Sequence, residues 1–433
     1  MQIETPAETT LPELHLERPR AAMVIVTTLF FIWGFVTVLN DILIPHLQNV
    51  FSLSNFQAMF IQFAFFSSYF VFALPWGKVV DRIGYRNTMA AGLLVSAIGC
   101  LLFLPAAMLA SYGLFLTAQV VLACGITALQ VAANPYVAAL GSERTASSRL
   151  NLAQAFNSLG TTIAPKIGGL LIFSAAATVT TQVLTGDALH TYRQQQASSV
   201  KLPYVLLAAI LLALAVFIRL RLPSFSSNTS DIRIQDVNTE SVWRNPQVVL
   251  AVIGIFVYVG GEVSIGSFLV RYLQLPEIAH MTERTAASYV SYYWGGAMVG
   301  RFVGAWLLRK VHSGVLLTLF AAIAAALVLI STLSHGYFAA AAILSVGLFN
   351  SIMFPSIFTL GIEGLGQRTS EASSLLVMAI VGAALIPIAQ GKLADTIGIQ
   401  KALLIPLICY AYIFFFGLWG SRRNRSKVLV ASS

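Results

Sequence analysis

Charged side chains are scarce in this 433-residue chain, in which Asp, Glu, Lys and Arg make up 10% of the residues. Soluble globular domains carry about 25%. The apolar share is 57% and the mean hydropathy is +0.80. This composition excludes a soluble enzyme, a nucleic-acid binder and a disordered scaffold. Because a membrane-spanning helix needs about 20 apolar residues, the long uncharged runs indicate a chain that crosses a membrane many times.

Further absences narrow the chemistry. The six histidines are scattered without metal-ligand spacing, and no G-x-x-x-x-G-K-[ST] phosphate loop occurs. No residue set combines a nucleophile, a base and an orienting group. The three cysteines lie in apolar segments, so no disulfide is indicated. We therefore expect no enzyme activity, no cofactor, no resident metal and no ATP-driven transport.

The apolar runs themselves lack the alternation of apolar and polar residues that marks a membrane β-barrel. They predict an all-α polytopic membrane protein with twelve transmembrane helices in two six-helix bundles. The predicted segments are 22–48, 57–77, 88–108, 113–139, 150–174, 200–221, 247–272, 286–308, 314–332, 338–360, 370–390 and 399–419.

Basic residues indicate the orientation of these helices. With the N-terminus inside, most of the 26 Lys and Arg residues fall at cytoplasmic ends and loops, as the positive-inside rule expects. The longest polar cytoplasmic connection then separates six helices from six. The predicted parts are a cytoplasmic tail (1–21), an N-terminal bundle (22–221), a cytoplasmic linker (222–246), a C-terminal bundle (247–420) and a second cytoplasmic tail (421–433).

Internal repeats support this division. PYVAALG (135–141) and PSIFTLG (355–361) share P-x-x-x-x-L-G at the ends of corresponding helices. GKVVDRIG (77–84) matches GKLADTIG (391–398), which the predicted topology places on the other side of the membrane. Two parallel six-helix repeats, each with inverted three-helix repeats inside it, predict both relations.

The predicted loop GKVVDRIGYR (77–86) has the features of a conformational latch. Gly77 allows close helix approach, Asp81 can bond helix-end amides or an arginine, and Arg82 and Arg86 stay in the cytoplasm. Such a charged loop can hold two bundles together in one state and release them in another. It resembles the signature loop of the major facilitator superfamily, and the alternative is an ordinary positive-inside loop.

Two acids lie within apolar segments. Asp41 follows the uncharged stretch 21–40, where an ionised carboxylate costs several kcal/mol and is expected to face a cavity, a cation or a proton. The alternative is that Asp41 lies in water at the outer membrane interface. Glu262, midway along its segment, is a second candidate to carry a proton, hold Na⁺ or bind sugar hydroxyls. A structural ion pair with another helix, for example with Lys166, is its alternative.

Amide side chains gather on the predicted fourth and fifth helices: Gln130 and Asn134, then Gln154 and Asn157. The spacing puts most of the polar residues of the fifth helix on one face. Amides suit a neutral polyol, since each offers a donor and an acceptor to hydroxyls. Hydrogen bonding between helices is the alternative. Trp294 and Asn350 are candidates for the C-terminal half of the same cavity, unless they only pack or anchor at the interface.

These residues lie in motifs that resemble the fucose–galactose–glucose:cation symporters over nearly the whole chain. The motifs are LNDILIPHLQ (39–48), FQAMFIQFAFF (56–66), VAANPYVAALG (131–141), RLNLAQAFNSLG (149–160), SFLVRY (267–272), GRFVGAWL (300–307) and FPSIFTLGIEGLGQ (354–367). The resemblance implies a rocker-switch carrier with one central sugar site in a bacterial inner membrane. It also implies that Asp41 is a coupling acid and that Gln62 and Asn157 belong to the sugar site.

One departure bears on the substrate. Fucose-transporting members have a glutamate in the fourth helix where this chain has Gln130, and an amide cannot carry a proton. LQVAANPYV (129–137) and GGEVSIGSFL (260–269) look more like the glucose/galactose branch, with Glu262 as a possible replacement acid. The resemblance therefore implies uptake of D-glucose or D-galactose by H⁺ or Na⁺ symport, with L-fucose:H⁺ symport as the alternative.

Two rival functions stay open. GTTIAPKIGG (160–169) is close to the G-x-x-x-G-P-x-x-G-G signature of multidrug:H⁺ antiporters. A sensor that binds sugar without transporting it would retain the same latch, repeats and embedded acids. For the sugar symporter, the expected partners are a small-molecule hexose and the lipid bilayer. No nucleic-acid partner is expected, and the protein is expected to be a monomer.

Overall fold

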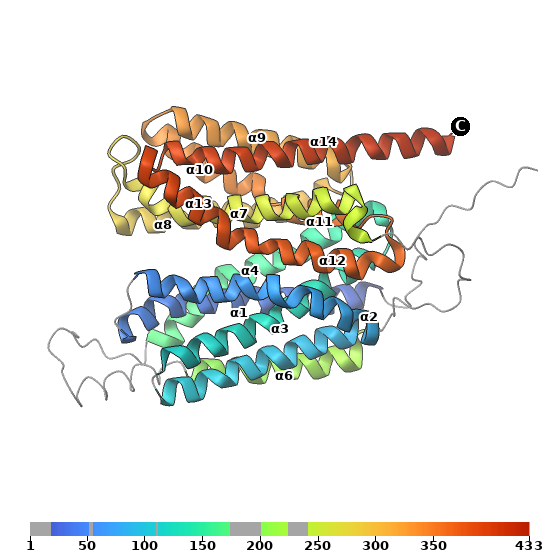
Figure 1. Ribbon diagram of the computed structural model, residues 1–433, viewed down its shortest axis with the longest axis horizontal. Helices are drawn as coiled ribbons and strands as arrows, with labels where there is room; N and C mark the ends of the chain where they lie inside the picture. The colour runs from blue at the N-terminus through green and yellow to red at the C-terminus, as the bar shows by residue number, and fades with distance from the viewer. Residues whose placement is uncertain (1–18, 52–54, 110, 174–200, 224–240, 433) are drawn as a thin grey trace, which may run out of the picture.

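Long helices that run side by side make up the molecule (Figure 1). The computed structural model describes residues 19–51, 55–109, 111–173, 201–223 and 241–432, and leaves aside the side chains of residues 19, 38–51, 55–62, 165–173 and 423–432. No strand occurs among these described residues. The all-α prediction is confirmed for this part of the chain.

The helices fall into two sequential sets. The first set is α1 (Pro19–Phe51), α2 (Asn55–Met108), α3 (Tyr112–Ala139), α4 (Ala146–Phe173) and α6 (Lys201–Arg221). The second set is α7 (Pro246–Gln274), α8 (Glu283–Leu307), α9 (Ser313–Leu333), α10 (Gly336–Asn350), α11 (Met353–Ile362), α12 (Thr369–Met378), α13 (Gly382–Ile397) and α14 (Leu404–Ser432).

The thirteen helices of the described residues follow the order of the twelve predicted segments. Helix α2 consists of two rods that meet at Gly84, whereas α10 with α11 and α12 with α13 each form one interrupted rod. Within the described residues, nine helical stretches are long and apolar enough to cross a membrane, and one of them, Phe63–Met108, contains both rods of α2. Helices α4 and α8 complete the set. The chain is therefore a multi-pass helical membrane protein.

The two sets form two bundles, lower and upper in Figure 1. In the N-terminal bundle α1 packs on α4, and α2 packs on α3 and α6. In the C-terminal bundle α14 packs on α7 and α9, and α13 packs on α7. The bundles meet where α12 lies against α2 and α3, and where α4 lies against α8 and α11.

Hydrogen bonds near the ends of the helices identify the two ends of the molecule. At one end Arg219 donates to the Asn87 side chain (2.7 Å). The Gln247 side chain, just after the start of α7, donates at the same end to the carbonyl of Leu360 (2.6 Å). We call this the linker end, because α6 ends and α7 begins there. At the opposite end the Gln400 side chain donates to the Ser334 carbonyl (2.7 Å).

A repeated glycine turn occurs once at each end. Gly84 divides α2 at the linker end with φ 78° and ψ 166°. Gly398 ends α13 at the opposite end with φ 88° and ψ 157°. Both conformations lie in the region open to glycine and strained for other residues. The match between GKVVDRIG and GKLADTIG therefore extends from sequence to backbone geometry.

Hydrogen bonds between the bundles close the linker end. Ser148 donates to the Ala305 carbonyl (2.6 Å), and Ser147 hydrogen-bonds Thr359. Ser370 of α12 donates to the Gly77 carbonyl of α2 (3.3 Å). Among the residues described, such bonds lie between the linker end and the middle of α4. The bundles are therefore joined over one half of the molecule.

Candidate functional site

The described residues predicted for the site project from two sets of helices: α3, α4 and α8, which contact the other bundle, and α7 and α10, whose main helix contacts lie within the C-terminal bundle. They are Gln130 and Asn134 of α3, Gln154 and Asn157 of α4, Glu262 of α7, Trp294 of α8 and Asn350 at the end of α10. Asp41 of α1 and Gln62 of α2 belong to described helices, but their side chains lie outside the described part of the structure.

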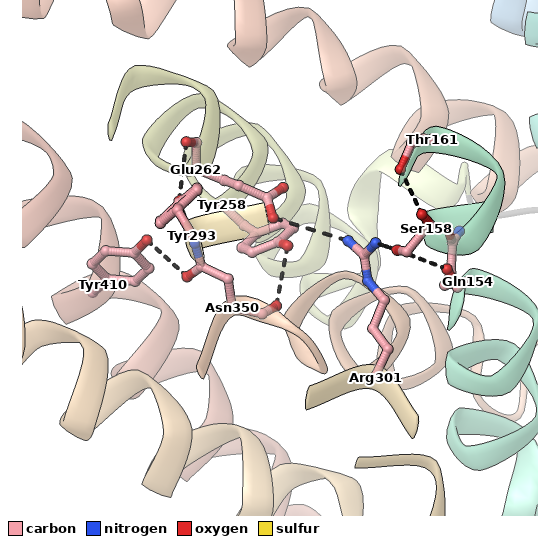
Figure 2. Close-up of polar contacts among 9 residues, drawn as sticks. All are labelled: Gln154, Ser158, Thr161, Tyr258, Glu262, Tyr293, Arg301, Asn350 and Tyr410. Atoms are coloured by element: carbon pink, nitrogen blue, oxygen red, sulfur yellow. Dashed lines mark hydrogen bonds and ion pairs between the residues drawn. The ribbon is translucent and has the colours of Figure 1, made fainter. Parts of the chain in front are cut away.

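Asn350 is the centre of a buried hydrogen-bond network in the C-terminal bundle (Figure 2). Its amide nitrogen donates to the Tyr293 hydroxyl (2.7 Å), and its amide oxygen accepts from Tyr410 (2.8 Å). Its backbone carbonyl accepts from the Tyr258 hydroxyl (3.1 Å). The Asn350 side chain thus ties α8 and α14 to the end of α10, and its backbone carbonyl ties α7 there as well, so Asn350 supports the site from within its bundle.

Replacing Asn350 by Ala is expected to destabilise the C-terminal bundle. The Tyr410 hydroxyl would lose its acceptor and Tyr293 would lose a donor, and a buried group without a partner costs about 1–3 kcal/mol. Thermal unfolding in detergent measures the loss. The triple variant Asn350→Leu, Tyr293→Phe, Tyr410→Phe removes the polar groups together and should recover most of the stability. An Ala variant with unchanged unfolding temperature would contradict the network's importance.

Glu262 forms an ion pair with Arg301 of α8 (Figure 2). Glu262 Oε1 lies 4.0 Å from Arg301 Nη2, and the two side chains are 10% and 16% exposed. The Tyr293 hydroxyl donates to the Glu262 backbone carbonyl (3.2 Å), which fixes this part of α7 against α8. The predicted alternative of a cross-helix ion pair is thus present in the structure, with Arg301 as the partner, while the Lys166 side chain lies outside the described residues.

Arg301 also contacts the other bundle. Its guanidinium donates to the Ser158 hydroxyl of α4, and its backbone carbonyl accepts from the Asn151 side chain (2.7 Å). Figure 2 shows the side chain reaching from α8 between Glu262 on one side and Ser158 on the other. Arg301 is therefore a polar contact that spans the boundary between the bundles.

The amides of the N-terminal bundle bond mainly within that bundle. Gln130 donates to the Tyr69 hydroxyl (3.2 Å) and accepts from the Asn134 side chain (3.4 Å). The Asn157 side chain donates to the Phe30 carbonyl of α1 (2.9 Å). In this state Gln130 and Asn157 act as contacts between helices, which is the alternative left open by the sequence. Gln154 is 8% exposed and lies one turn from Ser158.

Trp294 of α8 is only partly covered by the rest of the protein. It is 41% exposed, and its ring lies edge-on to that of Tyr293 with centroids 5.1 Å apart. A Cβ at Gly266 of α7 would lie 3.0 Å from the indole, so Trp294 packs directly on α7. Its exposed face can stack against the apolar face of a ring-shaped ligand.

The predicted latch residues divide into two groups. Gly77 is buried against α12, where a Cβ would lie 2.0 Å from the Ser374 Oγ. Arg86 donates to the Leu222 carbonyl at the beginning of the predicted linker (3.3 Å). Asp81 and Arg82 are exposed. Of the four latch residues, Gly77 therefore makes the contact across the bundles, and Arg86 hydrogen-bonds the chain just after α6.

Some polar residues of this region are not identified by sequence reasoning. Arg301 lies in GRFVGAWL, where the sequence shows a single cation with no acid at helical spacing. Gln390 of α13 accepts from Ser264 of α7, and both are buried. These partners come from different helices, so spacing along the chain does not reveal them. Among the described residues, no group of three or more His, Cys, Asp or Glu could hold a metal ion.

Comparison with known proteins gives consistent matches. The profile of the Major Facilitator Superfamily matches residues 24–380. The chain is 50% identical to the glucose/galactose transporter of Brucella abortus biovar 1 (strain 9-941) over 401 residues, which cover 93% of this chain and 94% of that protein. It is 38% identical to the L-fucose-proton symporter of Escherichia coli (strain K12) over 403 residues, covering 91% and 92%.

A solved structure agrees with these relatives. The crystal structure of FucP, a major facilitator superfamily transporter in the outward conformation, matches with a TM-score of 0.85 and 37% identity. The match covers 93% of this chain and 99% of that one. The helical fold, the relatives and the family profile agree, and the chain belongs to the major facilitator superfamily.

Proposed function

We propose that the protein is a secondary-active sugar transporter that takes up D-glucose or D-galactose together with a cation. The observation that carries this proposal is the 50% identity to a glucose/galactose transporter over nearly the full length of both chains. The amides, the Glu262–Arg301 pair and the accessible Trp294 ring at the bundle boundary supply the polar and aromatic groups that a hexose needs.

The two-bundle arrangement supports alternating access. In such carriers the bundles rock about a fixed central site, which opens to one side at a time. We place the linker end in the cytoplasm, because Arg82, Arg86, Arg219 and Arg221 gather there and basic residues favour the inner side. Both termini are then cytoplasmic, the membrane is the bacterial inner membrane, and the closed linker end corresponds to an outward-facing state. We also propose that the transporter works as a monomer.

Asp41 and Glu262 are the proposed coupling residues. Ionisable groups at membrane depth are costly and commonly mark ion or proton pathways. A relative at 38% identity is an L-fucose-proton symporter, which favours the proton as the coupling ion for this chain. Na⁺ is the alternative, held at Asp41 or Glu262.

Uptake into proteoliposomes tests the function. Radiolabelled D-glucose, D-galactose and L-fucose are offered separately, each with an inward proton gradient and then with an inward sodium gradient. Accumulation of glucose or galactose above equilibrium under one gradient is the expected result. Accumulation of L-fucose alone would replace the proposed substrate. No accumulation under either gradient would overturn symport, and dye efflux would then separate a multidrug antiporter from a sugar sensor.

Gln130→Glu is expected to change sugar preference or coupling. The amide donates to Tyr69 and accepts from Asn134, and a carboxylate in its place loses the donor and adds a proton-accepting group beside the site. Uptake of the three sugars over a range of external pH measures the change. A profile identical to that of the unmodified protein would mean that position 130 serves only the packing of α2 and α3.

A further inference from the structure

The pairing of Glu262 with Arg301 is incomplete as a hydrogen-bonded contact. The separation of 4.0 Å between Oε1 and Nη2 is longer than a charge-assisted hydrogen bond, which spans about 2.7–2.9 Å. The Tyr258 side chain lies beside the Glu262 carboxylate, and another nitrogen of Arg301 donates to Ser158. Glu262 Oε1 and Arg301 Nε nevertheless remain buried without a hydrogen-bond partner. Buried groups of this kind are costly, and in a native structure each needs a specific explanation.

A hydroxyl group has the chemistry that this pair lacks. An ionised carboxylate only accepts hydrogen bonds and a guanidinium only donates them, whereas a hydroxyl does both at one oxygen. An oxygen about 2.8 Å from each of two atoms 4.0 Å apart makes an angle of about 90° between them, which one hydroxyl accommodates. Both side chains keep some exposed surface, although Glu262 Oε1 itself is covered in this state.

The neighbouring aromatic residue fits the same ligand. Trp294 and Arg301 are seven residues apart on α8, which places them on one face about 10 Å apart along the helix axis. Side chains on a helix lean toward its N-terminus, so Arg301 leans toward Trp294. A pyranose ring stacked on the exposed indole can therefore present a hydroxyl to the charged pair.

We propose that Arg301 and Glu262 together bind a single sugar hydroxyl, which accepts from the guanidinium and donates to the carboxylate. Arg301 is thereby a substrate-contacting residue. Sugars that present a hydroxyl at this position bind more tightly, so the contact determines part of the sugar specificity. This inference rests on the proposed function and deepens it. Because Arg301 also donates to Ser158, the sugar would bind where the two bundles touch.

Equilibrium binding by purified protein tests the proposal independently of transport. Competition against a labelled hexose is measured for D-glucose, D-galactose and their deoxy derivatives at each ring position and at C6. The variants are Arg301→Lys and Glu262→Gln, with Arg271→Lys as the matched control, because Arg271 is exposed on α7 near the opposite end. Size-exclusion profiles and unfolding temperatures establish that each variant is folded.

One deoxy sugar is expected to bind the unmodified protein about tenfold or more weakly, as loss of a hydrogen bond to charged groups implies. Glu262→Gln and Arg301→Lys should each weaken binding of the parent sugar by a similar factor. The affinity of each variant for that one deoxy sugar should stay close to the affinity of the unmodified protein for it. Arg271→Lys should show the same loss of affinity for that deoxy sugar, relative to the parent sugar, as the unmodified protein. Equal penalties for every deoxy sugar in every variant would overturn the inference.

Ser158→Ala separates sugar contact from a role in joining the bundles. It removes the side-chain contact of Arg301 with α4, and leaves in place both the Asn151 bond to the Arg301 carbonyl and the pair with Glu262. Under the proposal it retains the hydroxyl-specific penalty, whereas loss of that penalty would assign Arg301 to bundle contact instead. Hexose binding without gradient-driven accumulation would overturn the symport proposal and leave this inference standing.

Discussion

Replacing Asp41 by Asn is expected to abolish accumulation of hexose against its gradient while preserving exchange of sugar between the two sides of the membrane. The amide resembles the carboxylate in size but cannot take up and release a proton. A membrane potential of about 100 mV drives one elementary charge with about 2.3 kcal/mol. Since each 1.4 kcal/mol corresponds to about a tenfold concentration ratio, a driving force of about 2.3 kcal/mol supports about 50-fold accumulation of sugar. The variant should lose all of this accumulation.

The measurement compares uphill uptake with counterflow in the same proteoliposomes. Asp395→Asn is the control, because Asp395 is an exposed acid near the end of α13. Its accumulation and exchange should both match those of the unmodified protein. If Asp41→Asn still accumulates sugar, Asp41 is not a coupling residue, and the same pair of assays on Glu262→Gln then examines the second embedded acid.

Gly77→Leu is expected to prevent closure of the linker end and to stop transport. A Cβ at Gly77 would lie 2.0 Å from the Ser374 Oγ and 3.0 Å from its Cβ, so a leucine cannot fit while α2 and α12 touch. Overpacking costs about 1–3 kcal/mol. A cost of that size shifts the balance between closed and open states about 5- to 150-fold. The outward-facing state should therefore be depleted.

A cysteine at position 147 reports the state of the linker end. Ser147 is buried against Thr359 on a different pair of helices, so Ser147→Cys senses opening away from the substituted glycine. Its labelling by a hydrophilic maleimide should be slow in the parent protein and fast with Gly77→Leu. Unchanged labelling together with normal transport would contradict the steric argument.

Two further variants make this experiment specific. Gly113→Leu is the matched control, because a Cβ at Gly113 meets nothing within 4 Å. It should leave both labelling and transport unchanged. Gly77→Ala should have a smaller effect than the leucine, and adding Ser374→Gly should relieve it by removing the obstructing atoms.

The sequence predicts the architecture well because the bilayer constrains it strongly. Each span must be a helix of nearly fixed length, so apolar runs such as 247–272 coincide closely with a helix such as α7. The interruptions between α10 and α11 and between α12 and α13 are harder to predict from the sequence. The break between α10 and α11 lies after Asn350, where the Asn350 carbonyl accepts from Tyr258 of α7. It also lies shortly before Pro355, which has no N–H to bond the Ser351 carbonyl.

The site could be predicted only in part, for a related reason. Glu262 stands out because an acid in an apolar run is costly, and this cost is a property of the residue itself. Its partner, Arg301, is determined by how α7 and α8 pack, and no periodicity along one helix records that. Likewise, the polar stripe on α4 predicts one face, but not that Asn157 bonds the Phe30 carbonyl of α1.

The glycine turns at the two ends also bear on how the chain enters the membrane. The two copies share glycines, a lysine and an aspartate, yet the first has Arg82 and Arg86 where the second has Thr396 and Gln400. The left-handed glycine is the same in both, so the turn forms without the arginines. Turn geometry and charge are thus separable, because the glycine shapes the turn at either end of the molecule. In the proposed orientation, the arginines favour retention of the first copy in the cytoplasm during biogenesis.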